Sequence, residues 1–372
     1  MAIRYYYIDD DPKSTITETA KGLSIHPEEL IVTAFQHKEW DKQISFIIEN
    51  QQNFDGLLLD WTLNQKSEEG ADANFNVEAL AQQLRRHIID NDKIKKDFPI
   101  VICSADYRFQ DIFSKETSGH DLFDLVFEKD EFDTDQEKII LQLKDLAEGY
   151  KSISTHKSIK EIFGIENLEE LDYRVLDYME NQIGQPTHEI ARFMLTKIVK
   201  SNGILIDEYL LAARLGADIL NIDENSVQEW HKLMGIISET QFRGVFSNAW
   251  PKWWMHKVDE FWTNTFENSL GNLNAPQRIE MLNEQFGLHL KPAPILEKAS
   301  SSDFWVVCKK THTPLAMNDA ILATSDVNSS PWEEDEYYSI ETALEEDPKN
   351  IHILEKERVK KLKAEHTKIR PR

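Results

Sequence analysis

The sequence predicts an α/β domain at the N-terminus, followed by an all-helical domain and a small α+β module. Before residue 130, four short apolar runs alternate with helical stretches, a pattern typical of a parallel sheet buried on both faces. Between residues 158 and 270, apolar residues recur every three or four positions, and beyond residue 290 the pattern changes to short strand-like runs. A chain of 372 residues is long enough for two or three domains.

Polar residues follow each of the four apolar runs in the α/β domain. Asp9 and Asp10 follow the first run, Asp60 ends the second, Ser104 ends the third and Lys129 follows the fourth. The carboxyl ends of parallel strands meet at one edge of the sheet, where such folds bind ligands. We therefore expect these five side chains to lie together.

The chemistry of this set points to phosphoryl transfer. Three converging carboxylates repel one another unless a hard cation such as Mg²⁺ lies among them. Lys129 and Ser104 would stabilise the oxygens of a phosphoryl group, and Asp60 would be the nucleophile that becomes an aspartyl phosphate. Singly, an aspartate pair after a strand is also typical of a helix cap and a lysine of a solvated surface. The complete set in this order favours the joint site.

In the order and spacing of these residues, positions 1–150 resemble the receiver domain of two-component response regulators. The resemblance implies a doubly wound, five-stranded parallel sheet of the flavodoxin type. It identifies Asp60 as the phospho-acceptor, with Ser104 and Lys129 as its catalytic partners. It also implies a histidine kinase as phosphodonor, and no enzymatic activity beyond slow self-dephosphorylation. The Mg²⁺ ligands implied are Asp9, Asp10, Asp60 and the main-chain carbonyl of Thr62.

The chain departs from the family pattern in three places. Val126 occupies the position of the aromatic switch residue, and Asp130 replaces the proline that usually follows the lysine. We therefore do not expect phosphorylation to drive a strong conformational output. A polar stretch at 65–74 reads as an insertion beside the site, either a loose loop or a segment that selects a kinase.

Composition limits the partners. The net charge of −24 opposes binding to nucleic acid, which depends on Lys and Arg contacts to phosphates. Only the tail from residue 356 onward is locally basic, as expected of a solvated helix. No run has the length of a membrane span and no signal-peptide pattern is present, so we expect a cytoplasmic protein. Cys103 and Cys308 lie in separate apolar runs and are expected to be buried thiols.

The predicted boundaries beyond the α/β domain are a linker at 151–157, a helical domain at 158–290 and a β-containing module at 291–372. Periodic apolar residues predict that an amphipathic helix over 136–150 closes the first domain. The aromatic cluster at 250–262 is either an internal core seam or a partner-binding surface.

Two functions are compatible with these patterns. In the first, Asp60 accepts phosphoryl groups and residues 151–372 engage proteins rather than DNA. In the second, the receiver-like domain gates an unrecognised enzymatic activity in residues 151–372, for which His256, His312 and Asp319 are scattered candidates.

The chain combines a complete phospho-acceptor site with residues that do not favour a conformational switch, and residues 151–372 have no DNA-binding or catalytic motif. This combination suggests a phosphate sink, a protein that takes up phosphoryl groups without passing on a signal. This architecture is similar to the receiver-bearing phosphate-buffering component of the Detocs antiphage system. That resemblance implies a role in restraining a co-encoded, receiver-linked effector. The sequence leaves the oligomeric state open.

Overall fold

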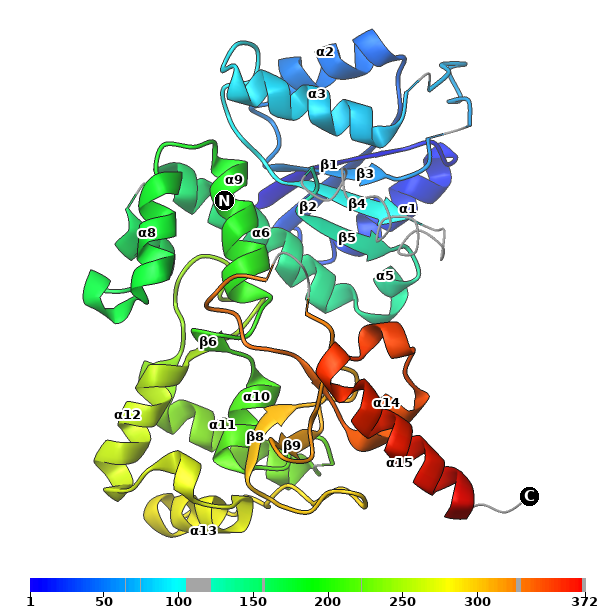
Figure 1. Cartoon of the computed structure of the whole chain (residues 1–372). Helices are drawn as coiled ribbons and strands as arrows, with labels where there is room; N and C mark the ends of the chain where they lie inside the picture. The colour runs from blue at the N-terminus through cyan, green and yellow to red at the C-terminus, as the bar shows by residue number, and fades with distance from the viewer. Residues whose placement is uncertain are drawn as a thin grey trace. The chain divides into compact units, whose positions relative to one another are not determined.

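A computed structural model gives the chain two compact units (Figure 1). Unit 1 contains Met1–Val199 and Arg243–Trp250, and unit 2 contains Lys200–Phe242 and Pro251–Arg372. The structure describes residues 1–63, 65–73, 75–104, 122–155, 158–221, 223–325 and 329–369. The chain passes between the two units three times, because the short segment 243–250 belongs to unit 1.

Unit 1 is built on a five-stranded sheet in which every pairing is parallel and the order is β2-β1-β3-β4-β5. This order is that of flavodoxin-like doubly wound folds, so the predicted α/β sheet is confirmed. Residues of β3 and β4 are buried throughout, which explains their unbroken apolar runs. The strands are β1 Ile3–Asp9, β2 Leu30–Gln36, β3 Gly56–Asp60, β4 Ile100–Ser104 and β5 Leu125–Glu128.

Helices cover both faces of this sheet (Figure 1). Helices α2 and α3 lie on one face, where Ile47 and Leu80 pack with strand residues such as Leu57 and Leu59. Helices α1 and α6 lie on the other face, where the Tyr5 hydroxyl donates a hydrogen bond of 2.8 Å to the Leu143 carbonyl. The helices are α1 Lys13–Leu23, α2 Trp40–Asn50, α3 Val77–Ile89, α5 Glu131–Thr134 and α6 Gln136–Thr155.

Helix α6 corrects the predicted linker at 151–157. The helix was expected over 136–150, but it continues through Thr155 because Ile153 is still buried in the core of unit 1. The apolar periodicity therefore extends beyond the assumed end of the domain. Positions 156 and 157 lie outside the described residues.

The rest of unit 1 comes from residues that were predicted to form a separate helical domain. Its elements are α7 Ile159–Phe163, a 3₁₀ turn Leu168–Glu170, α8 Tyr173–Gln182, α9 Thr187–Phe193 and a π-helical turn Met194–Val199. The segment 243–250 packs on α6, where Asp145 accepts hydrogen bonds from Asn248 Nδ2 at 3.0 Å and from the Ala249 N–H at 2.8 Å. The compact units therefore divide the chain elsewhere than at the predicted boundaries of 158 and 290.

Unit 2 has a helical core, but it is not all helical. A short antiparallel ladder joins β6 Leu205–Ile206 to β7 Trp253–Trp254. Trp254 and Trp262 are buried in this unit, which supports the core reading of the aromatic cluster, whereas Trp250 lies in unit 1. The helices are α10 Glu208–Leu215, α11 Glu224–Ile236, α12 Met255–Phe266 and α13 Ala275–Phe286, with 3₁₀ turns Ser238–Thr240 and Leu270–Asn272.

The last part of unit 2 is the small α+β region that the sequence predicted. Strand β8 pairs with β9, and β10 pairs with β11, each time antiparallel. A small cluster containing Ile321, Tyr338 and Val359 joins the second ladder to the C-terminal helix. The elements are β8 Phe304–Val307, β9 Pro314–Ala316, β10 Ile321–Leu322, β11 Tyr337–Tyr338, α14 Ile340–Glu345, 3₁₀ turns Pro348–Asn350 and Ile353–Glu355, and α15 Lys356–Ile369. Among the described helices, none combines the length and apolarity that crossing a membrane requires.

Candidate functional site

The polar residues predicted to meet at the carboxyl edge of the sheet do so. Asp9 and Asp10 stand at the end of β1, Asp60 ends β3 and Ser104 ends β4, and all four are almost completely buried. Strands β1 and β3 are neighbours at the point where the strand order reverses, which is the usual position of a ligand site in such sheets.

Three of these residues form an acidic cluster. Asp9, Asp10 and Asp60 each offer a carboxylate oxygen, and these oxygens lie within 4.8 Å of one another. In the described part of the chain, this is the single group of three or more His, Cys, Asp or Glu side chains with such an arrangement.

Lys129 provides the balancing positive charge. Its Nζ lies 2.8 Å from Oδ2 of Asp9, 2.9 Å from Oδ1 of Asp60 and 3.1 Å from Oδ2 of Asp11. The Lys129 N–H also donates a 2.7 Å hydrogen bond to the carbonyl of Ser104, which ties the end of β5 to the end of β4. All five predicted residues are therefore brought to one edge, and Asp11 joins them.

Main-chain donors fix the orientation of each carboxylate. The Asp11 N–H donates to Oδ1 of Asp9 at 2.9 Å, and the Thr62 N–H donates to Oδ2 of Asp60 at 2.8 Å. The Gln65 N–H donates to Oδ2 of Asp10 at 2.6 Å. Such bonds favour the charged form of a carboxylate and limit its rotation.

Two residues of the polar stretch 65–74, Gln65 and Glu68, are tied to the site. Besides the bond from Gln65 to Asp10, the Glu68 N–H donates to Oε1 of Gln36 at 3.0 Å, and Gln36 Nε2 donates to the Asp11 carbonyl at 3.0 Å. This stretch therefore contributes to the frame of the acidic cluster, in contrast to a loose loop. Asn74 lies outside the described residues.

Tyr7 is a site residue that the sequence reasoning missed. Its buried hydroxyl donates a hydrogen bond to Oδ2 of Asp9, the oxygen that also contacts Lys129. Burial raises the pKa of Tyr7, as do the neighbouring Cys103 and Asp9, so the hydroxyl remains a proton donor. The signal was present in the strand pattern, because residues two apart in a strand share one face of the sheet.

Without a bound cation, the carboxylates of the cluster outnumber its single ammonium group, that of Lys129. Burial and the Asp9 carboxylate together raise the pKa of Asp60 to about 6, although Lys129 and the Thr62 N–H act in the opposite direction. Burial alone would lower the pKa of Lys129, but the Asp60 and Asp9 carboxylates outweigh burial and raise it. One ammonium group is thus shared among several carboxylates.

This donor set fits a hard divalent cation such as Mg²⁺. Carboxylate and carbonyl oxygens are its preferred ligands, and a second positive charge would offset the repulsion that raises the pKa of Asp60. Asp9, Asp10 and Asp60 would hold the ion. The main-chain carbonyl of Thr62, two residues after Asp60, is the further ligand implied by the resemblance.

The scattered candidates for a second active site have separate structural partners. Asp319 accepts hydrogen bonds from the N–H of Ser300 at 2.8 Å and from its hydroxyl at 2.9 Å. The ring of His312 stacks on Tyr209 with a centroid distance of 4.2 Å, and His256 is exposed on α12.

Comparisons with known proteins add no further identification. No protein-family model matches the chain, and no curated protein matches it. The geometry of the acidic cluster is therefore the basis for assigning a function.

Proposed function

We propose that this protein is a response-regulator-like phosphoryl acceptor, in which Asp60 takes a phosphoryl group from a phosphohistidine of a partner histidine kinase. One observation carries the proposal: Lys129 Nζ lies 2.9 Å from Oδ1 of Asp60, within the buried acidic cluster. The cluster lies where the strand order of the β2-β1-β3-β4-β5 sheet reverses. A carboxylate beside a lysine and a cation-binding set is the chemistry that an aspartyl phosphate requires.

The proposed step is a substitution at phosphorus. A carboxylate oxygen of Asp60 forms the new P–O bond, the P–N bond to the kinase histidine breaks, and the imidazole leaves with the electron pair and takes a proton from solvent. Lys129 faces the negative charge on the phosphoryl oxygens, and the Ser104 hydroxyl donates a hydrogen bond to one of them. Mg²⁺, when bound, supplies further neutralisation of these oxygens.

Chemical trapping tests the position of the phosphoryl group. An acyl phosphate is reduced by borohydride to an alcohol, so a phosphorylated Asp60 would become homoserine. We expect peptide mass spectrometry to find homoserine at position 60 after treatment with a phosphodonor and Mg²⁺, and no such product in Asp60→Asn. Homoserine at another aspartate, with position 60 unmodified, would contradict the assignment.

The same proposal extends to a phosphate sink that restrains a co-encoded, receiver-linked antiphage effector. Two observations support storage over switching. Val126 on β5 is aliphatic and half-buried at the position of the usual aromatic switch, and Ile139 and Leu146 of α6 are buried in the core of unit 1 rather than exposed for pairing. A domain of this kind would hold a phosphoryl group without a large rearrangement.

Competition for phosphoryl groups tests the sink. The protein is titrated into a reaction in which a histidine kinase encoded beside it phosphorylates the co-encoded receiver. We expect phosphorylation of that receiver to fall as the wild-type protein is added, and to remain constant with Asp60→Ala. A phosphorylated form that instead activates an output of its own would rule the sink out.

A further inference from the structure

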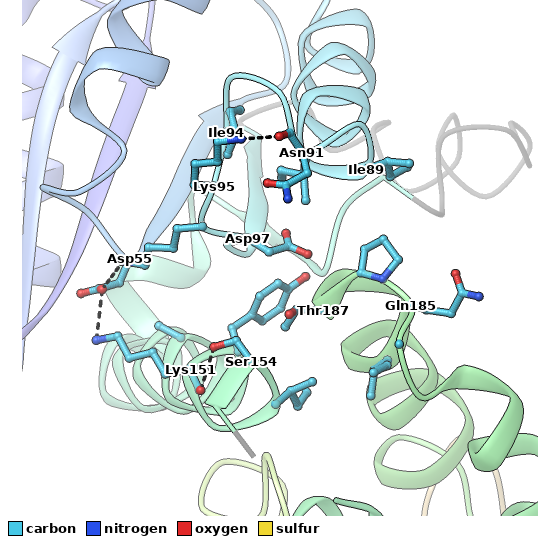
Figure 2. Close-up of a pocket in the computed structure, with 18 of the residues that line it drawn as sticks. Asp55, Ile89, Asn91, Ile94, Lys95, Asp97, Lys151, Ser154, Gln185 and Thr187 are labelled. Carbon is cyan, nitrogen blue, oxygen red and sulfur yellow. Dashed lines mark hydrogen bonds and ion pairs between the residues drawn. The ribbon is translucent and has the colours of Figure 1, made fainter. Parts of the chain in front are cut away.

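A cavity of about 640 Å³ lies in unit 1, at the amino ends of the strands (Figure 2). Its lining comes from the loops that lead into β3 and β4, from the C-terminal half of α6, and from the turn between α8 and α9. The acidic cluster lies at the carboxyl ends of the same strands, so this cavity is a separate feature. Its volume is within the range of small-molecule binding sites.

Six isoleucines contribute to the wall of the cavity, and two of them are exposed to solvent. Ile89 is 57% exposed and Ile183 is 39% exposed, although both are large apolar side chains on its lining. Covering apolar groups that are in contact with water lowers the free energy, so these side chains favour a ligand with an apolar surface. The isoleucines that line the cavity are Ile88, Ile89, Ile94, Ile153, Ile183 and Ile190.

One side of the cavity carries three lysines, namely Lys95, Lys96 and Lys151. Figure 2 shows Lys95, Asp55 and Lys151 on this side, and Gln185 and Thr187 across the cavity from them. Asp55 forms ion pairs with two of these lysines: its Oδ1 lies 2.8 Å from Nζ of Lys96 and 3.1 Å from Nζ of Lys151. An ammonium group has three N–H donors, so these contacts leave capacity for a further acceptor.

The second carboxylate of the lining, Asp97, is paired with side chains that do not line the cavity. Its Oδ1 accepts a 3.1 Å hydrogen bond from Arg85, and its Oδ2 lies 2.8 Å from both the N–H and the Nδ1 of His188. Lys96 and Lys151 thus contact Asp55, whereas Lys95 Nζ donates to the Asn91 carbonyl. Three lysines and two carboxylates, Asp55 and Asp97, line the cavity, so positive charges are in excess. This local excess of positive charge stands out in a chain whose net charge is −24.

From this combination we infer that the cavity binds a small organic anion with an apolar body. The isoleucines would cover the body, and Lys95 and Lys151 would face the anionic head. Charge attraction selects an anion, and the exposed isoleucines select an amphipathic one over acetate or another compact ion. Binding does not require phosphorylation of Asp60, so Asp60→Ala is expected to bind the anion as well as the wild type.

Octanoate is a suitable probe, and isothermal titration of the full chain measures its binding. Octanol has the same chain without the charge, and acetate has the charge without the chain. We expect saturable binding of octanoate, with octanol and acetate each at least about tenfold weaker, the ratio that corresponds to 1.4 kcal/mol. Binding should weaken as ionic strength rises, because the lysines lie near solvent.

Lysine variants locate the site. Lys151→Gln and Lys95→Gln are each expected to weaken octanoate binding about fivefold, which corresponds to roughly 1 kcal/mol. Lys144→Gln is the matched control, because Lys144 is also on α6 but pairs with Glu29 and does not line the cavity. Lys95 is exposed, so its variant serves if Lys151→Gln fails to fold.

Three results would overturn the inference. They are the absence of saturable octanoate binding by the folded protein, equal affinity for octanoate and octanol, and unchanged affinity in folded lysine variants of the cavity. Cooperative thermal unfolding at the wild-type midpoint establishes that a variant is folded.

Discussion

Lys129 and Asp60 form an ion pair of 2.9 Å at the end of the sheet, although they come from the ends of two strands that are not neighbours. The same Nζ also contacts Asp9 at 2.8 Å. Removing this ammonium would leave several buried carboxylates facing one another. The Lys129 ammonium is therefore important both for the stability of the cation-free protein and for the proposed phosphoryl transfer.

The first prediction concerns Lys129→Met. In EDTA, the free energy of unfolding should fall by about 3 kcal/mol, because the variant leaves a buried ionic group unpaired. Mg²⁺ should restore part of this loss, and phosphorylation should be abolished. Urea unfolding with and without Mg²⁺ measures the effect. Lys144→Met, which removes the more exposed pair with Glu29, is the control, and an equal loss of stability in both variants would contradict the prediction.

The second prediction concerns pH. The pKa of Asp60 is about 6 in the folded protein against an ordinary value of 3.8, so the folded state binds the proton more tightly than the unfolded state. Without a cation, stability contributed by the neutral carboxyl is present below pH 4 and is lost as the pH rises through 6. Asp60→Asn avoids this loss. At pH 7.5 in EDTA the variant should exceed the wild type by about 3 kcal/mol.

Denaturant unfolding of both proteins at several pH values measures this difference. The gap between Asp60→Asn and the wild type should close as the pH falls to 4, and Mg²⁺ should narrow it at pH 7.5. A gap that is constant from pH 4 to pH 7.5 would show that Asp60 is not the titrating group.

The third prediction separates the two tyrosines of β1. Tyr7→Phe removes the hydroxyl that donates to Asp9, so Mg²⁺ affinity and phosphorylation rate should both fall by about tenfold. Tyr5→Phe is the matched control, because the Tyr5 hydroxyl donates to the Leu143 carbonyl in the core. Each substitution should cost about 1 kcal/mol of stability.

Mg²⁺ titration together with urea unfolding distinguishes these effects. If Tyr7→Phe lowers stability but binds Mg²⁺ as tightly as Tyr5→Phe does, Tyr7 has no role in positioning the Asp9 carboxylate.

The fourth prediction concerns the segment 243–250. A Cβ atom at Gly149 would overlap the ring of Phe246, so Gly149→Ala must move this ring away from α6. We expect a loss of about 2 kcal/mol in the free energy of unfolding. Gly235→Ala on α11 is the control, because a Cβ there meets nothing within 4 Å and should stabilise the helix by about 0.5–1 kcal/mol. Equal effects at the two glycines would contradict the packing described here.

Much of the site followed from the sequence because a parallel sheet fixes where strand ends lie. Once four buried strands were identified, Asp9, Asp60, Ser104 and Lys129 had to reach one edge, whatever their separation along the chain. The role of Tyr7 depends on a hydrogen bond within one strand, and the two-residue alternation of β1 was sufficient to suggest it.

The domain boundaries were less predictable. The packing of residues 243–250 on α6 depends on Asp145 and Gly149, which are distant in sequence and carry no local signal of the contact. The predicted linker at 151–157 begins too early, because the buried Ile153 continues the apolar face of α6. Tertiary contacts of this kind override local composition.

The most direct test is the intact mass of the protein after incubation with acetyl phosphate and Mg²⁺, beside an Asp60→Ala variant and an EDTA control. We predict one phosphoryl adduct on the wild-type protein and none in either control, because the proposed reaction requires both the Asp60 carboxylate and a cation bound by the acidic cluster. An adduct of the same yield on Asp60→Ala would contradict the proposed acceptor. An adduct unaffected by EDTA would contradict the role of the acidic cluster as a cation site.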